Sequence, residues 1–186
     1  MSNDYDIEYY ENNGQIGDRI ALKFFAALVK KQFKSGTMLD FGCGTGFFLK
    51  KFDPESYTKY GFDISNEALE IAKQNNPQTK FIGIDQIEDE SLDCICSLHT
   101  LEHIKDPEEI ISKFSKKLKK DGLLFVIMPN DNSIGKRLKG EDWFAYHDKT
   151  HISLLPVAKW KQLITNNNFR ITKIGGDGLW DTPYIK

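Results

Sequence analysis

The sequence has little of what would place it in a specialised class of proteins. The 186 residues include only three cysteines, and the net charge at neutral pH is −2. An odd, small number of cysteines argues against a disulfide framework, so we expect free thiols in a reducing compartment, the cytoplasm. The near-neutral net charge gives no overall attraction to nucleic acid or to a membrane surface.

Long apolar runs are also missing. None approaches the roughly 20 apolar residues that a membrane-spanning helix needs, so we expect no membrane insertion. Met1-Ser2-Asn3-Asp4 lacks the basic and apolar parts of a signal peptide. The hydrophobic content of 40% is nevertheless enough for the core of one domain. We expect that domain over 16–186, after a polar segment over 1–15.

Apolar and turn residues alternate along the chain in a pattern that predicts a layered α/β fold. A serine cap at Ser65 and the pair Asp106-Pro107 mark two helix starts. Apolar spacing predicts strands over 37–41, 57–63, 79–84, 92–98, 123–128 and 169–174, and helices over 16–33, 46–52, 65–75, 106–119 and 156–167. Because strands alternate with helices, we predict a doubly wound, mostly parallel sheet with helices on both faces.

The stretch Met38–Gly46, with the sequence MLDFGCGTG, carries the clearest functional signal. It predicts a buried strand that breaks into a glycine loop before a helix. Glycine lets the backbone come close to a ligand because it has no Cβ. Asp63 follows at the end of the next apolar run, where an acid can accept both hydroxyls of a ribose. The two features together predict a nucleoside cofactor at the carboxyl ends of parallel strands.

The spacing of the glycines indicates which cofactor this is. A dinucleotide-binding turn has the pattern G-x-G-x-x-G, but Phe47 stands where the third glycine would fall. Asp40, just before the loop, would repel a pyrophosphate and suit a cation. S-adenosylmethionine carries an ammonium and a sulfonium and no phosphate. The sequence therefore favours S-adenosylmethionine over NAD.

These motifs resemble those of the class I S-adenosylmethionine-dependent methyltransferases. Leu39–Gly46 resembles their first motif and Gly61–Ser65 their second, and three further segments follow in the family's order over 81–85, 92–97 and 118–124. The resemblance implies a Rossmann-like fold, with the seventh strand absent or incomplete because little chain follows residue 174. It also implies a set of cofactor contacts: Asp40, Gly42, Cys43, Gly44, Gly46, Asp63, Ile64, Asp85, Gln86 and Leu98.

Histidine is the natural proton acceptor near neutral pH, and the sequence has four. All of them follow the fourth or fifth expected strand, on the side where a methyl acceptor would lie. His151 is our first candidate for a general base and His99 the second. His99 and His103 are spaced i, i+4, which suits a metal, and some class I members hold a divalent ion at a similar segment. Many others have Glu-His here without one, so we expect no metal.

Residues 131–153 lack an apolar face and are expected to form a long acceptor-side loop. The segment 128–144 resembles members of the family that are associated with polysaccharide clusters and others that methylate quinones. Four aromatic side chains could form an acceptor platform or simply pack the loop: Trp143, Phe144, Tyr146 and Trp180. The basic clusters 116–120 and 136–139 are of a kind that binds nucleic acid. Without a net basic surface or a motif that stacks on single-stranded bases, however, RNA binding is a minority interpretation.

Our prediction is thus a methyltransferase acting on a small molecule, through O-methylation of a saccharide or cell-surface glycan precursor. The alternatives are a quinone or aromatic O-methyltransferase and a module that binds S-adenosylmethionine without turnover. A nicotinamide-dependent oxidoreductase is a more distant one. S-adenosylhomocysteine would be the product, no nucleic-acid partner is expected, and the sequence does not fix the oligomeric state.

Overall fold

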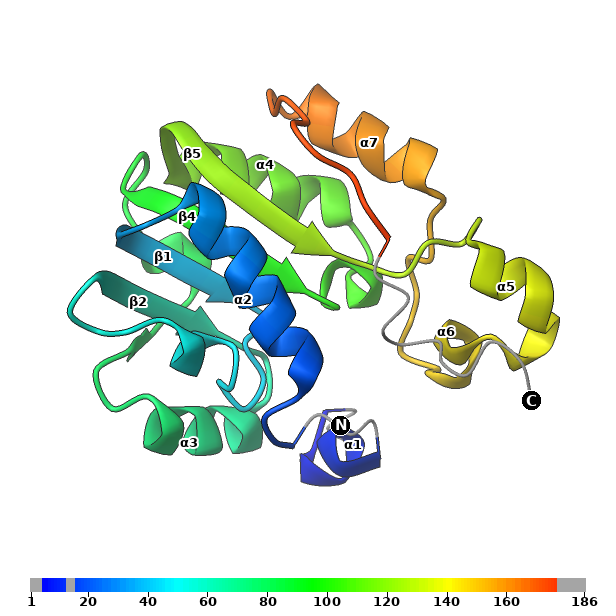
Figure 1. The fold of residues 1–186 in the computed structure, drawn as a ribbon, viewed down its shortest axis with the longest axis horizontal. Coiled ribbons are helices and arrows are strands. Elements are labelled where there is room, and N and C mark those ends of the chain that lie inside the picture. Colours follow the sequence, from blue (N-terminus) through cyan, green and yellow to red (C-terminus); the bar gives the residue numbers. More distant parts are fainter. Residues whose placement is uncertain (1–4, 13–15, 177–186) are drawn as a thin grey trace. The chain divides into compact units, whose positions relative to one another are not determined.

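The computed structural model describes residues 5–12 and 16–176. These residues divide into two compact units. The first contains the described residues up to Leu98 together with Lys116–Ile127. The second contains His99–Ser115 and the described residues from Met128 onward. Figure 1 labels the elements of both.

The first unit is built on a sheet of five strands: β1 Gly36–Phe41, β2 Tyr57–Phe62, β3 Lys80–Phe81, β4 Leu92–Leu98 and β5 Leu118–Ile127. Their order is β3-β2-β1-β4-β5, and every neighbouring pair is parallel. Figure 1 labels the strands of this order from β2 to β5. The order reverses between β1 and β4, and ligands of such sheets bind at the carboxyl ends of the strands at this switch point. The predicted fold class, a doubly wound parallel sheet flanked by helices, is confirmed.

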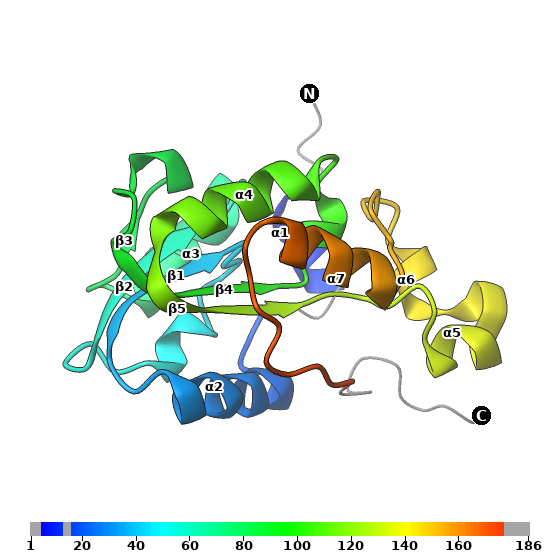
Figure 2. The ribbon, with the colours of Figure 1, turned by 90° about the horizontal axis from the view of Figure 1, so that it is seen from above.

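One face of the sheet forms the hydrophobic core of the first unit with α2 (Ile20–Gln32), which lies along it in Figure 2. The helix has apolar residues at helical spacing, and Phe25 and Val29 are almost fully buried. Met38 of β1 is paired in register with Cys94 of β4, so their side chains share this face. All three cysteine thiols are free and buried.

Two further helical elements of the first unit position the loop after β1. The helix α3 (Asn66–Asn75) begins at Ser65, whose hydroxyl accepts a hydrogen bond from Ala68 N at 3.2 Å, as the sequence predicts. The helix expected over 46–52 is wrong: only a single 3₁₀ turn, η1 (Leu49–Lys51), forms there. The preceding glycines have positive φ, so the chain leaves the loop too late for a full helix.

The second unit is helical. It contains η3 (Leu101–His103), most of α4 (Pro107–Lys117), α5 (Ile134–Lys139), η4 (Gly140–Asp142), α6 (Phe144–His147) and α7 (Val157–Asn166). Asp106 caps α4 as predicted, accepting from Glu109 N at 3.2 Å. The long loop expected over 131–153 is instead three short helices. Ser133 caps the first of them, α5. Trp143, which is only 1% exposed, lies between the other two and packs them onto the second unit.

Three other expectations are corrected by the structure. The third strand has two residues, and Asp85 lies in a 3₁₀ turn, η2 (Ile84–Gln86), rather than at the strand end. The strand expected over 169–174 does not form: its described residues are extended without a sheet partner. A short helix, α1 (Ile7–Asn12), lies in the polar segment where no element was expected.

Gly46 is a position of the loop where a side chain would meet its neighbours. Its φ is +79°, and an added Cβ would lie 2.6 Å from Asn76 Nδ2 and 3.1 Å from Ala72 Cα in α3. We expect Gly46→Ala to lower the free energy of unfolding by about 2–4 kcal/mol, from strain and overpacking combined. Gly83→Ala is the matched control, because its nearest contact would be 3.6 Å away, from Gln86 Oε1. Urea denaturation of both variants measures this, and equal midpoints would contradict it.

Candidate functional site

The glycine loop after β1 is held by hydrogen bonds from both sides. Gly42 N and Cys43 N both donate to the carbonyl of Phe62 at the end of β2, at 2.8 and 2.9 Å. On the other side, Asn76 Nδ2 donates to the carbonyl of Gly46 at 2.9 Å. Gly42 and Gly44 have φ of +80° and +50°, a conformation that favours glycine. The loop is thus preformed with bare backbone at the switch point of the sheet.

Asp63 is joined to this loop by its carboxylate. Its Oδ2 accepts from Gly44 N at 2.7 Å, and its Oδ1 accepts from Ser65 N at 2.9 Å and from the Tyr10 hydroxyl at 3.0 Å. The side chain therefore lies beside the glycine loop directly after β2, and its contact with a ribose stays a prediction. Tyr10 is a contact that sequence reasoning missed, because no motif marks the helix α1.

Asp40 is the most unusual group of the first unit. It is 1% exposed, and neither carboxylate oxygen has a hydrogen-bond partner among the described residues. Burial, and secondly the charge of Asp63, raise the pKa of Asp40 to about 8. An ionised carboxylate without a partner is costly in such a place, so the environment is incomplete until a cation or a proton is supplied.

A small hollow of about 50 Å³ opens beside Asp40. Five of the predicted cofactor residues line it, among other side chains: Asp40, Gly42, Cys43, Gly44 and Leu98. Gly46 and Asp63 belong to the same loop region but do not line the hollow, and Ile64 is 71% exposed. Asp85 and Gln86 lie in η2, where Gln86 Oε1 accepts from Gly83 N at 2.9 Å. These residues make up the candidate cofactor site.

Arg19 also lines this hollow, and no sequence motif marks it as a site residue. It precedes α2 directly, with extended backbone, which is why the helix begins at Ile20 and not at residue 16. Burial lowers the pKa of the Arg19 guanidinium to about 10, so it is charged at neutral pH. The hollow therefore presents both a carboxyl group and a cationic guanidinium to a ligand.

In the second unit, three of the four histidines gather around Glu102, and His147 is exposed. The rings of His103 and His151 have centroids 4.6 Å apart. His99 Nδ1 lies 3.4 Å from Glu102 Oε1. Burial lowers the pKa of His103, and the nearby His151 lowers it further, while Glu102 opposes the shift. Both predicted catalytic histidines, His99 and His151, thus belong to this one group.

The aromatic platform expected around 143–146 is only partly available. Trp143 is 1% exposed and makes edge-to-face contacts with Phe144 and Tyr146, at 5.4 and 5.3 Å between ring centroids. It therefore packs the second unit, and Tyr146, 38% exposed, is the ring that a ligand could reach. Trp180 lies outside the described residues.

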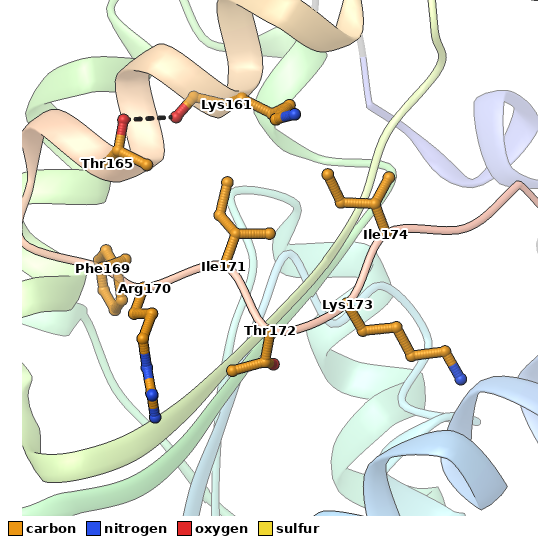
Figure 3. Close-up of a pocket in the computed structure, with 8 residues that line it drawn as sticks. All are labelled: Lys161, Thr165, Phe169, Arg170, Ile171, Thr172, Lys173 and Ile174. Atoms are coloured by element: carbon orange, nitrogen blue, oxygen red, sulfur yellow. Dashed lines mark hydrogen bonds between the residues drawn. The ribbon is translucent and has the colours of Figure 1, made fainter.

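A second hollow lies in the second unit, between α7 and the extended segment 169–174 (Figure 3). Ile171 points toward α7, whereas Arg170 and Thr172 point away from it, so the segment alternates as a strand would. The only hydrogen bond drawn there joins Thr165 Oγ1 to the carbonyl of Lys161, at 2.9 Å. Nothing in this hollow adds to the chemistry of the other two groups.

Among the described residues, no helix has both the length and the apolar character needed to cross a membrane. The comparison with known families matches residues 13–174 to the family described as "Methyltransferase domain". That range includes the glycine loop, Asp63 and the histidine group.

Two of three similar curated proteins have methyltransferase names. A ubiquinone biosynthesis O-methyltransferase of Haemophilus ducreyi is 32% identical over 102 residues, covering 48% of this chain and 43% of that protein. One of Hydrogenovibrio crunogenus is 26% identical over 136 residues, 67% of this chain and 56% of that protein. The chain thus spans about half the length of these relatives. An uncharacterised protein of Methanocaldococcus jannaschii, MJ1123, is 26% identical and covers 91% of this chain and 80% of its own.

Solved structures share the fold. The plantazolicin methyltransferase BpumL, crystallised with S-adenosylhomocysteine, superposes with a TM-score of 0.64 at 22% identity, covering 86% of this chain and 66% of its own. Phosphoethanolamine N-methyltransferase 2 of Haemonchus contortus, in complex with S-adenosylmethionine, gives 0.62 at 19% identity, covering 79% of this chain and 36% of its own. With its motifs, its sheet order and the matched range, the chain belongs to the methyltransferase domain family, within the class I S-adenosylmethionine-dependent methyltransferases.

Proposed function

We propose that this chain transfers the methyl group of S-adenosylmethionine to an oxygen of a small-molecule acceptor. The observation that carries the proposal is Asp40, a buried acid without a hydrogen-bond partner among the described residues, beside a preformed glycine loop. An ammonium group is the ligand that such a carboxylate lacks. The methyltransferase family match supports the same conclusion.

The residues of the first unit suit the separate parts of the cofactor. Asp40 would accept from the ammonium and Arg19 would pair with the carboxylate of the methionine part, because both line the hollow. Asp63 would accept from the ribose hydroxyls. For the adenine we retain Asp85, which the family resemblance implies as the acceptor of the exocyclic amine. The resemblance also implies the backbone N–H of Gln86 as a donor, but in this structure that N–H already donates to the carbonyl of Gly83 at 3.0 Å.

The acceptor that we favour is an aromatic hydroxyl. Two of the curated relatives are named as ubiquinone biosynthesis O-methyltransferases, and no relative reported above has a name that points to the saccharide expected from the sequence. A phenolic hydroxyl has a pKa near 10, so it needs less help to lose its proton than a sugar hydroxyl does. Tyr146, exposed in the second unit, is a ring on which an aromatic acceptor could stack.

His151 is the group that we propose as the general base. Its Nδ1 lies 2.6 Å from the carbonyl of Ala145, which fixes the proton on Nδ1 and leaves the lone pair on Nε2. Asp148 Oδ2 lies 3.8 Å from that Nε2 and would stabilise the ring once it is protonated. His99 is the second candidate. The base takes the hydroxyl proton as the oxygen attacks the methyl carbon, and S-adenosylhomocysteine leaves.

Replacing His151 tests this role. We expect His151→Ala to lower kcat by about 10²–10⁴, the usual contribution of a general base, and to leave the Kd for S-adenosylhomocysteine unchanged. His147→Ala is the control, because His147 is exposed in the same segment. Transfer is measured with labelled cofactor. Full activity in His151→Ala would remove His151 as the base.

The function itself is tested with labelled S-adenosylmethionine and two acceptor panels, polyhydroxylated aromatics and saccharides. Methyl transfer to an aromatic hydroxyl supports the proposal. Transfer only to saccharides would return the acceptor to the first expectation, and tight cofactor binding without transfer to either panel would identify a binding module. Calorimetry that showed NAD binding and no S-adenosylhomocysteine binding would overturn the whole proposal.

A further inference from the structure

Three side chains of the second unit come together in the manner of metal ligands. Glu102, His103 and His151 each offer one ligand atom, and these atoms all lie within 4.8 Å of one another. Their backbone positions are fixed as well, because the carbonyl of Glu102 accepts from Ile152 N and Ser153 N at 3.0 and 2.8 Å. The turn η3 and the segment after His151 are therefore held together independently of the three side chains.

The hydrogen bonds of the two imidazoles determine which nitrogen carries the lone pair. His151 donates its Nδ1–H to the carbonyl of Ala145 at 2.6 Å. The Thr150 hydroxyl donates to Asp148 Oδ1, so its oxygen must accept from His103 Nδ1, which lies 2.9 Å away. Both rings thus hold a proton on Nδ1 and a lone pair on Nε2. Metal-binding histidines are oriented in this way, by a carbonyl or an oxygen that accepts from the other nitrogen.

Glu102 supplies the independent observation that this group lacks a ligand. Its side chain is 0% exposed, and neither carboxylate oxygen has a hydrogen-bond partner among the described residues. His99 Nδ1, 3.4 Å from Oε1, neutralises it only when that ring is protonated. A buried carboxylate with no hydrogen bond is costly, and a divalent cation would compensate that cost.

We propose that Glu102, His103 and His151 bind one divalent transition-metal ion. Two imidazoles and a carboxylate are the ligand set of catalytic zinc sites that keep a position open for water or substrate. Mg²⁺ and Ca²⁺ prefer oxygen ligands only, so Zn²⁺, Co²⁺ or a similar ion fits this site better. Ligand atoms around zinc lie about 3.3 Å apart, a value that follows from bond lengths near 2 Å, so the side chains would have to close by at most about 1.5 Å.

The role of this ion rests on the proposed function, whereas its binding does not. A bound cation lowers the pKa of a coordinated hydroxyl, so an acceptor with its oxygen in the open position would lose its proton to water without a protein base. His151 would then be a ligand and no longer a proton acceptor. The substrate class that follows is a phenol or catechol, whose oxygens can coordinate the ion.

The test is a titration of the full chain, freed of metal with a chelator, with ZnCl₂ by calorimetry and with CoCl₂ by visible spectroscopy. We expect one ion per chain, and an affinity at least tenfold lower in Glu102→Gln and His151→Gln. His147→Ala is the control that retains the native affinity, because His147 is exposed. Circular dichroism checks the fold of each variant, and Glu102→Gln removes a buried charge and keeps the side-chain shape.

Each outcome decides the proposal. The absence of stoichiometric binding, or equal affinity in Glu102→Gln and the native chain, would overturn it. Intense thiolate-to-cobalt absorption would place the ion at a cysteine and would overturn it too. Since these titrations contain no S-adenosylmethionine and no acceptor, they are independent of whether the chain transfers a methyl group. Loss of methyl transfer on chelation, restored by Zn²⁺, would then assign the ion to catalysis. Unchanged transfer would mean that His151 accepts the proton of the acceptor hydroxyl and that the ion has no part in this step.

Discussion

Replacing Asp63 by asparagine is expected to weaken the binding of S-adenosylhomocysteine about 100-fold. The carboxylate is proposed to accept from both ribose hydroxyls, and a hydrogen bond to a charged group contributes about 1.5–3 kcal/mol. An amide can replace one such acceptor at reduced strength and cannot replace both. A loss near 2.7 kcal/mol corresponds to the stated factor. Calorimetry with S-adenosylhomocysteine measures it without any acceptor.

The hydrogen bonds of Asp63 add a second expectation, about Tyr10. A carboxylate has about four acceptor positions, and the Tyr10 hydroxyl, Gly44 N and Ser65 N already use three of them. That leaves about one position for two ribose hydroxyls. Because the two backbone donors are fixed by the loop and the helix cap, the Tyr10 hydroxyl is the group that must give way.

Tyr10→Phe is therefore the matched variant for Asp63→Asn. It removes the competing donor and keeps the ring, which lies close to Gly44 and fills the space around it. We expect its affinity for S-adenosylhomocysteine to be equal to or higher than that of the native chain. If Tyr10→Phe weakens binding as strongly as Asp63→Asn, the hydroxyl belongs to the cofactor contacts and the competition does not exist. Unchanged binding in Asp63→Asn would remove Asp63 from the ribose.

The first unit could be predicted from the sequence where a local signal fixed the structure. Ser65 caps α3 because its hydroxyl competes for a free backbone N–H, and that preference is visible in the sequence. Asp63 directly follows β2 beside the glycine loop, one residue past the strand end, where the strand pattern over 57–63 placed it. Arg19 and Tyr10 could not be predicted, because their place in the site depends on how α1 and α2 pack and not on any motif around them.

The predictions that were wrong also failed because tertiary packing, and not local sequence, decides the structure of those segments. Residues 131–153 show no continuous apolar face, yet one buried tryptophan, Trp143, and the Ser133 cap are enough to fold them into short helices. The segment 169–174 has the alternation of a strand, but a strand also needs a neighbour, and the described residues supply none. Glu102 was not a predicted ligand, since its proximity to His151 depends on a fold that brings together positions 49 residues apart.

Asp40→Asn should change both the stability and the pH dependence of the chain. The pKa of Asp40 is raised from 3.8 to about 8 in the folded state, so between these values the folded chain holds a proton that the unfolded chain has lost. Stability then falls as pH rises through this window, by at most about 1.4 kcal/mol per pH unit, and becomes level above pH 8. In Asp40→Asn this slope should disappear. Denaturation at several pH values measures it, with the exposed Glu55→Gln as the control.

Binding of the cofactor should release the proton that Asp40 holds in the folded chain. An ammonium beside Asp40 favours the ionised carboxylate, so binding of S-adenosylhomocysteine near pH 7 should release close to one proton. Affinity should accordingly rise with pH, by up to tenfold per unit, until about pH 8. Calorimetry in two buffers of different ionisation enthalpy counts the protons released. We expect Glu55→Gln to release as many protons as the native chain and Asp40→Asn to release none. The affinity of Asp40→Asn for S-adenosylhomocysteine should be about 10- to 100-fold lower, since one charge-assisted hydrogen bond is lost. Proton uptake on binding, or native affinity in Asp40→Asn, would mean that the buried acid does not face the ammonium group, and the proposed orientation of the cofactor would have to be reversed.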